Sequence, residues 1–285
     1  DVDIQRAFLF YWRGDIEAAL RLTRQSLSVI PKEHGYAHNL AVLYTALAEA
    51  LSGRREEALQ LLSAALIEDC AGGSRNAGVF LVAQTGIYHY AGDLTAVEVT
   101  AKQILSVHET VSVPDFWYAY APYFLACSAY ERNLLDTAAE LFGRVEQMRY
   151  TITTRLYQDA LVGLALVAWA KGEMDRASEY TVATRSFAME MSDPYSMQIA
   201  NSFKTRMAIL SGNVRDDPAK TAPPEDDSNK LWLEIPSLTS AEYQVRRGIG
   251  AECADRSDGA RKCGWLAEPG HAEEVDVEIK AYGAR

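Results

Sequence analysis

The sequence predicts an all-α fold, in which helical hairpins stack into a solenoid with a period of about 40 residues. Three observations predict it. Short turn motifs recur at nearly constant spacing, apolar residues recur at helical spacing between them, and strand signals are absent from the repeated region. Of the 285 residues, 48% are hydrophobic and 24% are charged, which is typical of a soluble globular protein. No apolar run approaches the roughly 20 residues that a membrane span needs.

The turn motifs set the period. Neighbouring turn residues lie between 39 and 41 positions apart, and they are Gly14, Gly53, Gly92, Asn133, Gly172 and Gly212. Glycine and asparagine readily adopt the left-handed conformation that ends a helix. A small residue follows each of the first five after five positions, namely Ala19, Ala58, Val97, Ala138 and Ala177. A small side chain there would let the two helices of a hairpin approach closely.

The organisation along the chain follows from these turns. Residues 1–213 are predicted to form five to six repeats, 214–230 an acidic, proline-rich linker or loop, and 231–285 a further, truncated helical repeat. Proline and glycine mark loops within the repeats at Cys70–Ala77, Thr110–Asp115 and Met191–Pro194. Because the chain starts at Asp1 and shows no polar capping helix at its end, we expect it to be a piece of a longer protein.

Each turn residue and the small residue after it resemble the tetratricopeptide repeat, although the period exceeds the usual value of about 34 residues. That resemblance implies a right-handed superhelix with a concave groove. Three segments further resemble the helical-repeat sensor region of LuxR-type transcriptional regulators, which are signal-transduction ATPases of the group that includes the maltose-regulon activator. They are YERNLLDTAAELFGRVEQMRY (130–150), QDALVGLALVAWAKGEMDRA (158–177) and LWLEIPSLTSAEYQVRRG (231–248). The resemblance implies an ATPase module before the repeats and a helix-turn-helix DNA-binding domain after them in the full-length protein.

The sequence itself carries neither of those activities. It has no G-x-x-x-x-G-K-[ST] phosphate loop, so we expect no ATP binding by this segment. It has no basic patch and a formal charge of −11, so we expect no direct nucleic-acid binding. No nucleophile motif or cofactor loop is present either, so neither an enzyme nor a cofactor is predicted.

Histidines and cysteines give no metal signal. His34 and His38 are four residues apart, as in a helical metal pair, but Gly35 lies between them and no third ligand has suitable spacing. A junction between a loop and a helix is therefore favoured, and no metal is predicted. The four cysteines show no C-x-x-C pair, and Cys127 reads as a small buried hydrophobe. We expect a reduced compartment, the cytoplasm, and no membrane partner.

Aromatic residues are concentrated between Phe116 and Tyr130. Tyrosine and tryptophan combine an apolar ring with a polar group, which suits a ligand groove. The first helices of the hairpins line the concave side of a solenoid. The predicted ligand-binding residues on that face are His89, Tyr90, Tyr120, Tyr123, Tyr130, Asp159, Trp169 and Arg206, with Tyr11 and Trp12 beside them. The alternative is that these rings pack between repeats.

Two functions remain open at this point. The first is a non-enzymatic sensor domain of a bacterial transcriptional regulator, which binds a small-molecule or peptide effector, or a regulatory protein, in the concave groove. The second is a protein–protein interaction scaffold that has no small-molecule ligand. The sensor is favoured because the resemblance to the LuxR-type regulators implies it.

Overall fold

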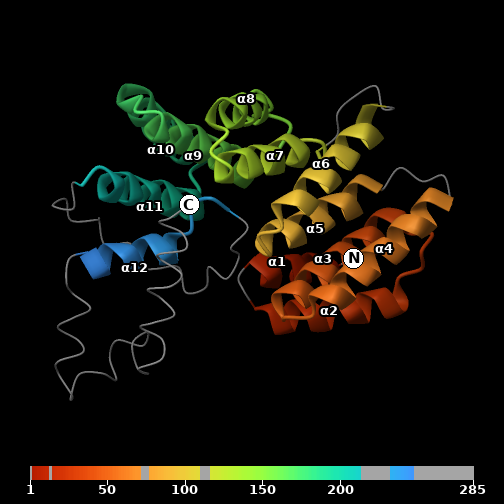
Figure 1. The fold of residues 1–285 in the computed structure, drawn as a ribbon. Helices are drawn as coiled ribbons and strands as arrows, with labels where there is room; N and C mark the ends of the chain where they lie inside the picture. Colours follow the sequence, from red (N-terminus) through yellow and green to blue (C-terminus); the bar gives the residue numbers. More distant parts are fainter. Residues whose placement is uncertain (1, 13–14, 72–76, 110–115, 213–231, 247–285) are drawn as a thin grey trace, which may run out of the picture. The chain divides into compact units, whose positions relative to one another are not determined.

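The computed structural model describes residues 2–12, 15–71, 77–109, 116–212 and 232–246. Within these ranges the chain forms twelve α-helices and no strand, which confirms the all-α prediction (Figure 1). The helices are α1 (Val2–Trp12), α2 (Ile16–Val29), α3 (Gly35–Leu51), α4 (Arg55–Ala71), α5 (Ala77–Tyr90), α6 (Leu94–Glu109), α7 (Tyr120–Glu131), α8 (Leu135–Glu146), α9 (Thr154–Ala170), α10 (Met174–Met191), α11 (Pro194–Leu210) and α12 (Pro236–Arg246).

The chain divides into two compact units. Of the described residues, those up to 180 together with 232 and 233 form unit 1, and 181–212 together with 234–246 form unit 2. In unit 1, each helix from α1 to α9 packs against the next one along the chain. The odd-numbered helices α1, α3, α5, α7 and α9 also contact one another in series. Successive hairpins therefore stack with their first helices side by side, as the repeat predicts.

The turns have the backbone conformation that the sequence predicts. Gly53, Gly92, Gly172 and Gly212 have φ between 72° and 83°, and Asn133 has φ 58°, whereas Gly14 lies outside the described residues. The backbone N–H of Arg54, just after Gly53, donates to the carbonyl of Glu49 at 2.9 Å. The same bond recurs after Gly92, Asn133 and Gly172. It is the six-to-one bond of a Schellman motif, which satisfies a carbonyl at the end of the first helix.

The small residues after the turns are buried, as predicted. Four of them have no exposed surface and the fifth retains 2%; they are Ala19, Ala58, Val97, Ala138 and Ala177. Side-chain caps fix the starts of several helices. Asp15 accepts from the N–H of Ala18 at 3.0 Å, and Thr153 accepts from that of Leu156 at 3.1 Å. Such caps satisfy N–H groups that have no partner inside the helix.

Some boundaries differ from the sequence prediction. The loop predicted over Cys70–Ala77 is shorter, since α4 continues to Ala71 and α5 begins at Ala77. The segment predicted to be helical from Leu231 begins its helix only at Pro236, because proline favours the first turn of a helix and lacks the N–H that later positions need. The predicted loop at Thr110–Asp115, the linker at 214–230 and the stretch after residue 246 lie outside the described residues.

Candidate functional site

Three of the predicted ligand-binding residues lie in the interior of unit 1. Tyr120 and Tyr123 on α7 and Asp159 on α9 are buried, with 8%, 0% and 0% of their surface exposed. The hydroxyl of Tyr123 donates to Oδ2 of Asp159 at 2.5 Å. The sequence placed Tyr123 and Asp159 on the inner face of the solenoid, and the structure shows that they bond to each other and contribute to packing between repeats. The packing alternative describes these three residues, and their role in ligand binding stays a prediction.

A chain segment far along the sequence reaches the same carboxylate. The backbone N–H of Leu233 donates to Oδ2 of Asp159 at 2.9 Å, and the guanidinium of Arg155 lies 3.7 Å from Oδ1. Arg155 also lies over the ring of Trp232, 5.0 Å from its centroid. The Tyr123 and Trp232 rings are 5.9 Å apart. We call Tyr123, Arg155, Asp159, Trp232 and Leu233 the Asp159 cluster.

The electrostatics of this cluster are those of a structural network. Burial raises the pKa of Tyr123 well above its usual value, and the nearby Asp159 carboxylate raises it further. Burial and the same carboxylate also raise the pKa of the Cys127 thiol. Both groups therefore stay protonated at neutral pH, and Cys127 is the buried, unreactive residue that the sequence predicts. Burial raises the pKa of Tyr120 to about 12, although a bond to Thr153 opposes the shift.

A second group of predicted residues is reachable from solvent. His89, Tyr130 and Trp169 are each half-buried and lie three residues before Gly92, Asn133 and Gly172, respectively. They occupy equivalent positions near the ends of α5, α7 and α9, which contact one another in series. We call these three residues the turn-edge row. Tyr90 follows His89 and is 42% exposed.

The remaining predicted residues lie elsewhere. Arg206 is on α11 in unit 2, where its guanidinium lies 3.5 Å from Oε2 of Glu234. Glu234 is fully buried and also accepts hydrogen bonds from Ser202 at 2.6 Å and Thr239 at 2.8 Å. Tyr11 is buried in unit 1, with its ring 5.5 Å from that of Tyr44. The side chain of Trp12 is outside the described part of the structure.

Sequence reasoning missed three residues of the Asp159 cluster, namely Arg155, Trp232 and Leu233. Nothing in the sequence indicates that Arg155 is buried, because an arginine near the start of a helix is usually exposed to solvent. Trp232 lies in the apolar run LWLEI, which the sequence analysis interpreted as part of a helix. The signal that could have separated it is Pro236, since the residue before a proline favours extended backbone and a helix boundary there.

The described residues contain no group of three or more histidine, cysteine, aspartate or glutamate side chains that could hold a metal ion. His34 precedes the first residue of α3, and Nδ1 of His38 lies 3.3 Å from the carbonyl of Ile30. These positions agree with the junction between a loop and a helix that the sequence favours. No described helix is long and apolar enough to cross a membrane.

A family model described as the MalT-like TPR region matches residues 1–248. The chain belongs to this family. The match confirms the resemblance to the maltose-regulon activator group that the repeat sequences suggested. No curated protein sequence matches the chain.

As a MalT-like TPR region, the chain offers two kinds of side-chain arrangement in unit 1. The Asp159 cluster is buried and holds a distant segment of the chain against α7 and α9. The turn-edge row presents partly exposed rings from three consecutive hairpins. Rings with polar groups on a row of stacked helices suit binding, because a ligand can contact several repeats at once.

Proposed function

We propose that this MalT-like TPR region is the sensor domain of a bacterial LuxR-type transcriptional regulator. It binds a small-molecule or peptide effector, or a regulatory protein, and performs no catalysis itself. In the full-length protein, an ATPase module and a DNA-binding module would receive the signal. The family match and the serial packing of the odd-numbered helices support the proposal.

The observation that carries the proposal is the turn-edge row. His89, Tyr130 and Trp169 come from three hairpins that pack in series. A ligand that touches side chains from neighbouring repeats favours the arrangement in which all its contacts form, and so it shifts the conformational equilibrium of the stack. That shift is the coupling that a sensor needs between its binding site and its neighbouring modules.

A thermal-shift screen with metabolites and short peptides tests this proposal. A true effector raises the melting temperature, because it binds the folded state and not the unfolded one. We expect the double variant Tyr130→Ala with Trp169→Ala to fold but to lose the shift. The matched control is Tyr150→Ala, which removes an aromatic ring that is 88% exposed and outside the row.

The contrary result distinguishes the sensor from a scaffold. If no metabolite or peptide moves the melting temperature while a protein partner co-purifies with the chain, and the double variant keeps that partner, then the repeats act as a protein-interaction scaffold. In that case the turn-edge row has no part in sensing.

A further inference from the structure

A cavity of about 730 Å³ that is open to solvent lies between one face of α2 and the turn that joins α3 to α4, within unit 1. Its lining combines apolar and charged side chains. Ile16, Leu20 and Leu51 supply the apolar part. Three arginines and Glu17 supply the charged part, and the arginines are Arg21, Arg24 and Arg54.

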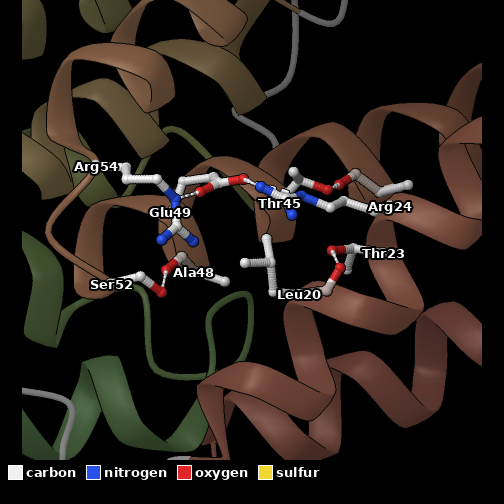
Figure 2. Close-up of polar contacts among 9 residues, drawn as sticks. Leu20, Thr23, Arg24, Thr45, Ala48, Glu49, Ser52 and Arg54 are labelled. Atoms are coloured by element: carbon white, nitrogen blue, oxygen red, sulfur yellow. Dashed lines mark hydrogen bonds and ion pairs between the residues drawn. The ribbon is translucent and has the colours of Figure 1, made fainter.

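Two of the arginines share one buried carboxylate, as Figure 2 shows. The side chain of Glu49 on α3 is only 8% exposed. Its Oε1 accepts from Nε of Arg24 at 3.1 Å and also from Nη2 of the same guanidinium. Its Oε2 accepts from Nε of Arg54. Glu49 therefore holds two guanidinium groups in fixed positions at the wall of the cavity.

The carboxylate does not exhaust the hydrogen-bonding capacity of these guanidiniums. A guanidinium has five N–H donors in a rigid planar arrangement. Arg24 makes hydrogen bonds through Nε and Nη2, both to Glu49, and Arg54 makes one through Nε. The end of the Arg24 guanidinium that carries Nη1 keeps its donors. This is the geometry that binds a carboxylate or phosphate through paired hydrogen bonds.

Arg21 adds a third positive charge to the lining of the cavity. It lies on the cavity-lining face of α2, one turn before Arg24, and is exposed. Within the described part of the chain it forms no hydrogen bond or ion pair. Arg21, Arg24 and Arg54 outnumber Glu17 and Glu49, so the cavity carries a positive charge on a chain whose formal charge is −11. A local positive field of this kind attracts small anions.

We propose that this cavity binds a small organic anion. Its carboxylate or phosphate contacts the three arginines, and its apolar body lies against Ile16, Leu20 and Leu51. The site is separate from the turn-edge row and goes beyond the proposed sensor function, because none of its lining residues belongs to that row. A ligand there touches α2 and the α3–α4 turn, and so it joins the first hairpin to the second.

Calorimetric titration of the whole chain tests the site with three probes. Octanoate carries both an anionic head and an apolar body, octanamide lacks the charge, and inorganic phosphate lacks the apolar body. We expect saturable one-to-one binding of octanoate that weakens with added salt, and weaker binding of the other two probes. Absence of octanoate binding, or equal binding of octanoate and octanamide, would overturn the proposal.

A variant locates the binding. Arg21→Gln removes an exposed charge that forms no hydrogen bond or ion pair with a described residue, so it should leave the fold intact and weaken octanoate binding about tenfold. Arg185→Gln, on α10 and also exposed, is the matched control and should bind as the natural chain does. Unchanged affinity in Arg21→Gln would contradict the site.

The two proposals fail separately. If an effector from the thermal-shift screen loses binding in the Tyr130 and Trp169 double variant but not in Arg21→Gln, the sensor function stands and the arginine-lined cavity is excluded as its site. If octanoate binds the cavity while the chain acts only as a scaffold, the anion site stands and the sensor function fails.

Discussion

Asp159 and Glu49 are both buried acids on odd-numbered helices of unit 1, but their partners differ. Asp159 binds a phenol, a backbone N–H and an arginine whose side chain is only 10% exposed. Glu49 binds two arginines whose side chains are 58% and 41% exposed. Removing Asp159 takes a carboxylate away from donors in the interior, whereas removing Glu49 takes one away from donors that water can reach. The same kind of residue therefore fixes the interior at one place and arranges charges at the surface at the other.

The largest effect is expected at Asp159. Asp159→Ala leaves the Tyr123 hydroxyl, the Leu233 N–H and the Arg155 guanidinium without their carboxylate, and should lower the free energy of unfolding by about 3–5 kcal/mol. Urea unfolding followed by circular dichroism measures it. The control Asp136→Ala removes an exposed carboxylate paired with Lys171 and should cause no measurable change. Equal midpoints for the two variants would mean that the Asp159 cluster adds nothing to stability.

A second substitution tests the packing behind the Asp159 cluster. Gly163 lies one turn after Asp159 on α9, and a Cβ there would come within 2.6 Å of the ring of Phe142. That ring packs against Tyr123, with 6.2 Å between their centroids. Gly163→Ala should therefore destabilise the chain by about 2 kcal/mol through overpacking. Gly143→Ala meets no atom within 4 Å and should be neutral or slightly stabilising, since alanine favours a helix.

Alkaline pH should lower the stability of the packing around Tyr120 on α7. The folded chain holds the Tyr120 proton more tightly than the unfolded chain, since its pKa rises from 10.0 to about 12. Its contribution to stability is complete below pH 10 and is lost as the pH rises towards 12. At pH 11 the loss is about 1.4 kcal/mol. Tyr120→Phe should remove this part of the alkaline loss, as measured by urea midpoints at pH 8 and 11, and Tyr150→Phe should retain it.

The smallest effect is expected at the other buried acid. Glu49→Gln weakens the hydrogen bonds to Arg24 and Arg54, but both arginines remain partly exposed to water. The free energy of unfolding should fall by about 1 kcal/mol. This difference between the variant and the natural chain should become smaller when salt is added. A loss as large as that of Asp159→Ala would show that the arginine positions are part of the core and would remove the contrast between the two acids.

The sequence predicted the features that depend on local structure. A positive φ at Gly92 and a buried small residue at Val97 follow from rules that act within one hairpin, and their recurrence along the chain made them recognisable. The predicted register also placed Tyr123 and Asp159 on the inner helices, where the structure joins them by a hydrogen bond. Whether such residues face a groove or pack between repeats stayed open, because periodicity identifies the inner helices but not what covers them.

The missed contacts are those between distant residues. Nothing near Asp159 indicates that Leu233 will bind it, since no repeat rule links the two positions. Arg24 and Glu49 escaped for a related reason. A charged residue on a helix is usually solvated, and only the neighbouring helix shows which carboxylate is buried.

The bond between Leu233 and Asp159 has a consequence for the order of folding. It joins residues 74 positions apart, whereas the hairpins before it rely on contacts with their immediate neighbours in the chain. During translation, α1 to α8 can assemble as they leave the ribosome, but the carboxylate on α9 waits for a partner that has not yet been synthesised. A recombinant chain that stops before Trp232 would leave that acid and the rings around it uncovered, and would be prone to aggregate.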